Sequence, residues 1–229
     1  MDKPTLLFAD SSTVYFVLML FSWEGRWELK EKVAFLIPED RDDWFYKATV
    51  DLLNKYGTKP DILAIGKGPG SFTGLKVGFA FMRTWALLSN TPLFPLSSLW
   101  FWYHVFCAQE KEPLLVRTNR SLYLGQQQDR YLGAKPLAEW GKEFSKAFVF
   151  GSAWRGHSRF PIDYKDFPNF EEVHLTIEKL IPPPLPSLHE ILDNKEKYHW
   201  SLALPHYGFE LSYLAKERKM VFHHEREKK

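Results

Sequence analysis

The sequence is poor in cysteine, since Cys107 is the only one among its 229 residues. A single cysteine excludes an intramolecular disulfide framework and any zinc or iron–sulfur site built from several cysteines. A chain without such a framework suits a reducing compartment, so we expect the protein in the cytoplasm. Cys107 itself stands among Val105, Phe106 and Ala108, as a core residue does.

Neither sign of charge is in large excess, because the sequence has 30 Lys and Arg and 28 Asp and Glu, which gives a formal net charge of +2. With 45% hydrophobic residues, this composition excludes a disordered chain and a basic nucleic-acid-binding arm. The longest uncharged run, residues 84–109, is interrupted by Pro92 and Pro95, and the N-terminus shows no hydrophobic segment that ends in a cleavage site. We therefore expect neither a membrane span nor a signal peptide.

Motifs for catalysis and for metal binding are absent from the sequence. The eight histidines include no pair three or four residues apart and no His-Glu-x-x-His, so no helical metal site is expected. Ser71 and Ser152 have no surrounding Gly-x-Ser-x-Gly that would mark a nucleophile. We predict no catalytic residue, no bound metal and no resident cofactor.

Aromatic residues, in contrast, are abundant and make up 17% of the chain. This is more than a core requires, and aromatic side chains are enriched at protein interfaces. The surplus predicts that part of the surface contacts another subunit.

The first hundred residues show a recognisable order of elements. The patterns predict strands at residues 5–9, 14–23, 27–37, 62–65 and 93–96 and helices at 42–56 and 75–89. Three strands, a helix, a strand, a helix and a strand are typical of a mixed α/β layer of the ribonuclease-H-like type.

A second half is predicted to begin near residue 98. Its expected elements are helices at 98–109, 137–144 and 173–180, strands at 114–118, 122–127 and 147–151, an extended proline segment at 182–186, and a helix capped by Ser187. We therefore expect two domains, residues 1–99 and residues 100–229. Residues 154–170 are assigned no role.

A glycine-rich segment, residues 66–78, follows a predicted strand and leads into a helix. This setting permits two interpretations: backbone amides that hold a phosphate, or glycines that allow a tight turn and close packing. The segment is neither a Walker A loop nor a dinucleotide fingerprint. Asp10, Gly68 and Gly70 are the candidate cofactor-binding residues under the first interpretation.

The helix after this segment is apolar on two sides. Between residues 75 and 88 only Lys76 and Arg83 are charged, and Gly74 and Gly78 would let another helix approach closely. Such a helix is buried within its own domain or forms a subunit interface together with helix 42–56.

The glycine segment also resembles the hallmark stretch of a known family. Gly66-x-Gly68-Pro69-Gly70-Ser71-Phe72-Thr73-Gly74-Leu75-Lys76-Val77-Gly78, with Asp10-Ser11-Ser12 before it and Ser97-Ser98-Leu99 after it, is similar to the TsaB family. The resemblance covers residues 62–99 and is faint beyond residue 100, and Asp42 and Asp43 depart from the family pattern, which makes the chain a divergent member. It implies two ribonuclease-H-like halves of the actin and sugar-kinase (ASKHA) superfamily.

The resemblance further implies a non-catalytic scaffold or activator subunit that pairs with the related catalytic subunit TsaD. The complex adds threonylcarbamoyl to the adenosine next to the tRNA anticodon, with a TsaE-like ATPase as a further partner and tRNA held through the complex. The implied partner surface lies on helices 42–56 and 74–89. Its residues are Phe45, Leu52, Gly74, Gly78, Phe81, Met82 and Trp85.

Two other functions remain open on the sequence alone. One is a nucleotide-using or phosphate-using enzyme of the ASKHA type, with Asp10 and residues 66–74 at its cleft; the other is a peptidase-like protein, for which no nucleophile and base can be assembled. The sequence also leaves open whether the isolated protein is a homodimer and which apolar side of helix 74–89 meets a partner.

Overall fold

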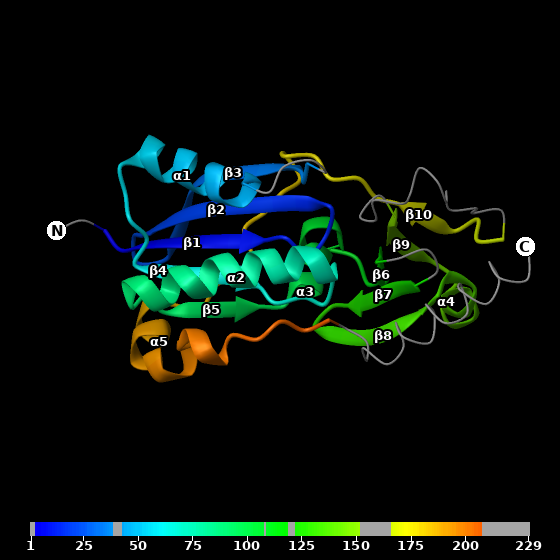
Figure 1. Cartoon of the computed structure of the whole chain (residues 1–229). Coiled ribbons are helices and arrows are strands. Elements are labelled where there is room, and N and C mark those ends of the chain that lie inside the picture. The colour runs from blue at the N-terminus through cyan, green and yellow to red at the C-terminus, as the bar shows by residue number, and fades with distance from the viewer. Residues whose placement is uncertain (1–2, 39–42, 108, 119–121, 152–165, 208–229) are drawn as a thin grey trace, which may run out of the picture.

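The computed structural model describes residues 3–38, 43–107, 109–118, 122–151 and 166–207. Asp42 and most of the segment 154–170 lie outside the described residues. Two five-stranded sheets lie side by side, with one helix between them (Figure 1).

The first sheet has the strand order β3-β2-β1-β4-β5. Its strands are β1 (Thr5–Asp10), β2 (Tyr15–Trp23), β3 (Trp27–Leu36), β4 (Ile62–Gly66) and β5 (Leu93–Leu96). The hairpins β1–β2 and β2–β3 are antiparallel, whereas β4 and β5 run parallel to β1. Strand β4 is buried throughout and β1 is buried from Leu6 onward, as expected of strands covered on both faces, whereas the edge strand β5 is half-buried at Phe94 and Pro95.

Two helices, α1 (Trp44–Tyr56) and α2 (Phe72–Ser89), cover one face of this sheet (Figure 1). Local sequence explains where they end: Gly57 and Asn90 follow the helices in the left-handed conformation. Ser71 begins α2, because its hydroxyl accepts a hydrogen bond from Gly74 N. Helix α2 therefore begins three residues before the predicted start at residue 75.

The second sheet repeats the topology of the first. Its strands are β6 (Leu114–Arg117), β7 (Leu122–Gln127), β8 (Arg130–Pro136), β9 (Ala147–Phe150) and β10 (Phe170–Glu172), in the order β10-β9-β6-β7-β8, with α4 (Leu137–Glu143) between β8 and β9. Strands β6 to β8 are antiparallel, and β9 and β10 are parallel to β6 and β9. The fold thus consists of two ribonuclease-H-like halves, which confirms the predicted fold class.

Two elements of the second half differ from the sequence prediction. Strand β8 was not predicted, because the turn before it is built by Gln128 in the left-handed conformation and carries no glycine. The helix predicted at residues 173–180 is wrong. Val173 N donates to Val149 O and continues the pairing of β10, and the side chains of Val173 and Leu180 pack on the core in a segment without helix. Tertiary packing overrides helix propensity there.

The chain then returns to the first sheet. After the proline segment, α5 (Leu188–Asp193) is capped by Ser187 as predicted, and the 3₁₀ helices η2 (Lys195–Tyr198) and η3 (Trp200–Leu202) follow. Helix α5 lies beside β5 (Figure 1), and the Tyr198 ring contacts the Phe94 ring of β5 at 5.1 Å. Trp27 Nε1 holds the proline segment by donating to Pro186 O at 2.7 Å.

Helix α3 (Ser98–Cys107) joins the two halves through a shared core. Phe101 contacts Phe8 of the first sheet at 5.1 Å, and Trp102 contacts Phe150 of the second at 5.3 Å. Phe101 and Trp102 are fully buried, so part of the aromatic surplus serves this junction. No helix within the described parts of the chain is both long and apolar enough to cross a membrane.

Candidate functional site

The glycine segment connects β4 to α2 and lies against the turn that follows β1. Its amides donate hydrogen bonds within the chain: Lys67 N to Leu96 O, Gly68 N to Ser98 Oγ, and Ser71 N to Ser12 O at 2.5 Å. A phosphate-holding loop needs amides that point at the ligand. These three amides instead hold the segment against its neighbours.

The glycines allow close approach of backbone to backbone. A side chain at Gly70 would collide with the main-chain oxygen of Ser12, and one at Gly74 with that of Ser11. At Gly78 a Cβ would lie 2.5 Å from Ser11 Oγ and 3.6 Å from the Phe45 ring. The turn that follows β1 therefore approaches α2 at its glycines, with the Phe45 ring of α1 in ordinary contact beside Gly78, and the tight-packing interpretation describes the observed geometry.

Asp10 ends β1 and is fully buried. Its Oδ1 accepts hydrogen bonds from Ser12 N at 3.0 Å and Ser12 Oγ at 2.8 Å, while Oδ2 lies beside Gly66 and the Ser98 hydroxyl. Burial raises the pKa of the Asp10 carboxyl, and the hydroxyls of Ser98 and Ser12 act in the opposite direction. In this arrangement the carboxyl contacts the chain itself, not an open cleft.

Residues 203–207, here called the C-terminal strap, cross the glycine segment. His206 N donates to Lys67 O at 2.6 Å, and a side chain at Gly68, which has φ 93°, would collide with His206 O. The Tyr207 ring contacts the Phe72 ring at 4.9 Å. Burial and the nearby Lys67 lower the pKa of the His206 imidazole, so the ring is neutral near pH 7. The strap covers the first part of the glycine segment.

The residues predicted for a partner interface fall into two groups. Five lie buried inside the chain, between the helices and the first sheet: Phe45, Leu52, Gly74, Gly78 and Met82. Phe81 and Trp85 are half-buried on α2, where the Phe81 ring contacts the Phe45 ring at 4.6 Å and the Trp85 ring at 5.9 Å. These five residues therefore form core contacts between the two helices and the sheet.

An apolar surface surrounds Phe81 and Trp85. We call it the outer face, and it comprises Tyr46, Val77, Phe81, Trp85 and Leu88. The side chain of Leu88 is 80% exposed and that of Tyr46 is 61% exposed. The recurrence of Val77, Phe81 and Leu88 on one side of the helix is the sequence signal for this surface, whereas no sequence signal distinguished the exposed Tyr46.

Neither a metal centre nor a reactive thiol is found in the described part of the chain. No group of three or more His, Cys, Asp or Glu side chains there could hold a metal ion. Burial raises the pKa of the Cys107 thiol to about 12, so it stays protonated and unreactive.

Comparisons with known proteins give one family match and several similar folds. Residues 44–134 match the family described as TsaD, tRNA N6-adenosine threonylcarbamoyltransferase. A Pseudomonas aeruginosa structure, described as an uncharacterized protein with similarity to peptidase YeaZ, is 20% identical with a TM-score of 0.61 and covers 90% of this chain and 100% of its own. YeaZ from Pseudomonas aeruginosa is 21% identical with a TM-score of 0.57 and covers 89% of this chain and 99% of its own. No curated protein sequence matches the chain.

The family match begins at α1, includes the whole of α2 and ends in β8, so it contains the outer face. The two YeaZ structures extend the similarity in fold to nearly the full chain. The resemblance noted in the sequence is thereby confirmed: residues 44–134 are similar to the TsaD family, and the fold of nearly the full chain is similar to that of YeaZ, which is also called TsaB.

Proposed function

We propose that this protein is a non-catalytic partner subunit of a TsaD-like enzyme, and that it activates threonylcarbamoyl modification of the adenosine next to the anticodon in tRNA. The observation that carries the proposal is the outer face of α1 and α2. The TsaD-family match over the same helices supports it.

The outer face has the composition of a protein interface. Its five side chains are aromatic or aliphatic, and Phe81 and Trp85 are large rings held in place by contacts with α1 and with each other. Half-buried aromatic rings flanked by exposed apolar residues are typical of interface anchors. Covering Leu88 and Tyr46 with a partner would remove apolar surface from water and stabilise the complex.

The test places a charge at the outer face without disturbing the core. In Leu88→Arg the new side chain replaces one that is 80% exposed, so the isolated protein keeps its fold. We expect the affinity for the TsaD-like subunit, measured by light scattering and titration, to fall at least about tenfold, since a charge would be buried unpaired. The rate of tRNA modification at limiting protein should fall in parallel.

Leu36→Arg is the matched control. Leu36 is 61% exposed and lies on β3, where its neighbour Phe35 packs toward α1 and Leu36 therefore points to the opposite face. This variant should pair normally. Normal pairing by Leu88→Arg, or absence of any complex with the wild-type protein, contradicts the proposal.

The same surface accounts for the other proposed associations. The isolated protein would pair with a second copy through the outer face, and the TsaD-like subunit would displace that copy. A TsaE-like ATPase and tRNA would join the assembled complex in the cytoplasm. With a net charge of +2, the chain lacks the positive field that would hold tRNA by itself.

The nucleotide-using alternative receives no support from the site geometry. Asp10 is buried, and the amides of Gly68 and Ser71 are occupied within the chain. We expect calorimetry with millimolar ATP or ADP and magnesium to show no binding. Saturable binding that Asp10→Asn abolishes would favour the enzyme instead.

A further inference from the structure

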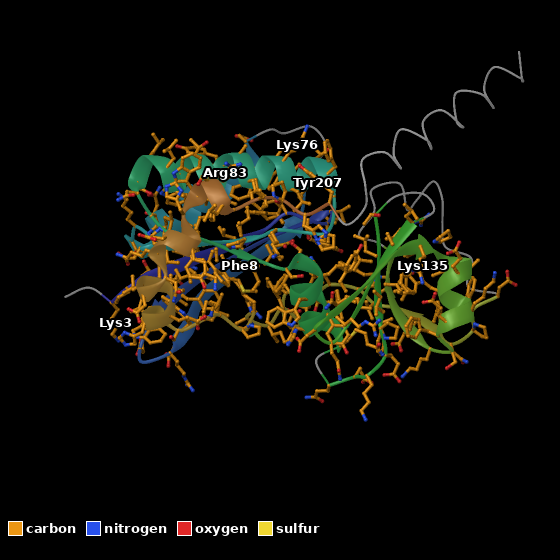
Figure 2. All side chains as sticks on the ribbon, turned by 90° about the horizontal axis from the view of Figure 1, so that it is seen from below. Lys3, Phe8, Lys76, Arg83, Lys135 and Tyr207 are labelled. Carbon is orange, nitrogen blue, oxygen red and sulfur yellow. The ribbon has the colours of Figure 1, made fainter. Side chains whose placement is uncertain are left out.

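A groove runs along α2 on the side away from α1. It has a volume of about 400 Å³ and lies between the helix and residues 200–207. Lys76, Arg83 and Leu87 line it from α2, and Trp200 and Tyr207 line it from the opposite side. Figure 2 shows Lys76 and Arg83 along α2, with Tyr207 near Lys76.

The groove presents two positive charges that no carboxylate neutralises within the described residues. Lys76 Nζ lies 4.3 Å from the centre of the Phe72 ring, and the Arg83 guanidinium lies 5.4 Å from that of Trp200. Arg83 Nε is buried and has no hydrogen-bond partner among the described atoms. No Asp or Glu is among the lining residues. The rings orient both cations but leave their hydrogen bonds to be made by a ligand.

The spacing of the cations constrains what fits between them. They are seven residues apart on one helix, a rise of about 10 Å. A peptide in the polyproline II conformation advances about 3.1 Å per residue with three residues per turn, so carboxylates three positions apart lie on one face and would reach both cations. Between the cations the groove is lined by the exposed Ala80 and Thr84 and by Phe79, which leaves room for an apolar side chain.

We propose that this groove binds an acidic segment of a partner protein in the polyproline II conformation, with two carboxylates three residues apart and an apolar side chain between them. Charge complementarity carries the choice of occupant. The groove and the outer face share no lining residue. The proposal does not depend on the proposed function.

An acidic peptide fits these observations better than single-stranded nucleic acid does. Nucleic-acid binding depends on many phosphate contacts, whereas this groove offers two cations in a largely apolar lining. A carboxylate can accept a paired hydrogen bond from the Arg83 guanidinium, including its buried Nε.

The test uses the full chain and a fluorescein-labelled hexapeptide, Ser-Glu-Val-Thr-Glu-Ser, with binding measured by fluorescence anisotropy. The control peptide has Gln in place of both Glu. We expect saturable binding of the acidic peptide, weaker at high salt, and at least about tenfold weaker binding of the Gln peptide.

Variants then locate the binding. Arg83→Gln and Lys76→Gln should each weaken peptide binding about tenfold, whereas Lys47→Gln, an exposed lysine on α1, should leave it unchanged. Thr84→Trp fills the groove from an exposed position while keeping both charges, and it should also block binding. Circular dichroism confirms that each variant is folded.

Three results with the peptides would overturn the proposal. They are equal binding of both peptides, no saturable binding at millimolar peptide, and binding that Arg83→Gln and Thr84→Trp leave unchanged. Preferential binding of a single-stranded oligouridine that depends on Lys76 and Arg83 would also overturn it and assign the groove to nucleic acid. Pairing through Leu88 is measured separately, so failure here is distinct from failure of the proposed function.

Discussion

Asp10 ends β1 in the interior of the protein, where its carboxyl is surrounded by Ser12, Ser98 and the Gly66 backbone. Because burial raises the pKa of this carboxyl, the folded state retains a proton that the unfolded chain releases above about pH 4. The contribution of Asp10 to stability is therefore present below the unfolded pKa and is lost as the pH rises through the folded pKa.

We predict that Asp10→Asn removes this pH dependence. The amide stays neutral, so the unfolding free energy of the variant relative to wild type should rise between pH 4 and pH 7. Urea unfolding at several pH values measures the difference. If the unfolding free energies of variant and wild type change in parallel with pH, the pKa of Asp10 does not differ between the folded and unfolded states.

Gly74 provides a second residue-scale prediction. In a helix, replacing Gly by Ala ordinarily stabilises by about 1 kcal/mol. Here the added Cβ would collide with the main-chain oxygen of Ser11, so we expect Gly74→Ala to destabilise by about 1–3 kcal/mol. Thr84→Ala, at an exposed position of the same helix, is the control and should not destabilise. Stabilisation by Gly74→Ala would contradict the close packing of α2 on the β1 turn.

The same geometry decides which variants report on pairing. A large side chain at Gly78 would meet Ser11 Oγ and the Phe45 ring in the interior. Gly78→Arg would therefore damage the core before it affected a partner. Leu88, at the exposed surface, reports on pairing alone.

At the scale of elements, α2 presents four distinct sides, which explains why its sequence is apolar nearly all round. Leu75, Met82 and Ala86 pack on the sheet. Another side meets α1, a third is the outer face, and the fourth, with Lys76 and Arg83, lines the groove. The residue at which α2 begins must therefore be fixed, because it determines which side chain lies on which side.

We predict that Ser71 sets that start. Its hydroxyl accepts from Gly74 N, so Ser71→Ala should lower the unfolding free energy by about 0.5–2 kcal/mol. Ser71→Asp keeps a capping oxygen and should recover most of the loss. Chemical denaturation measures both, and equal losses in the two variants would show that the cap does not stabilise α2.

At the scale of the whole molecule, α3 makes one core out of two sheets. Phe101 packs on the first half and Trp102 on the second. In addition, α5 and η2 follow the second half along the chain and lie beside β5 of the first half. We propose that the two halves, divided near residue 99, unfold together as one cooperative unit.

Trp102→Ala tests this proposal. The side chain is fully buried between the halves, and its Nε1 donates to Ser12 Oγ at 3.3 Å. Its removal should cost about 3–5 kcal/mol and should separate the single unfolding transition into two. Trp100→Ala, at a half-buried ring that donates to Asp129, is the control and should keep one transition with a smaller loss. Two transitions in the wild-type protein would contradict the proposal.

Much of the first half could be predicted from local patterns. The period of apolar residues in α1 and in the strands and the glycines after β4 are local signals, so their structure follows from nearest neighbours along the chain, although the predicted start of α2 lay three residues too late. Strand β8 and residues 173–180 could not be predicted, because pairing with β7 and packing on a distant core decide their conformation.

The sequence by itself determined the fold class, the resemblance to the TsaB family and the apolar character of α2. Tertiary structure alone decided which of those apolar residues face outward: Met82 and Gly78 are buried, whereas Phe81, Trp85 and Leu88 form a surface. It also brought Trp200 and Tyr207 beside Lys76 and Arg83 to form the groove. The physical reason is that contacts between segments more than a hundred residues apart decide which side chains are exposed and which lie next to each other. The local period of apolar residues contains no information about such contacts.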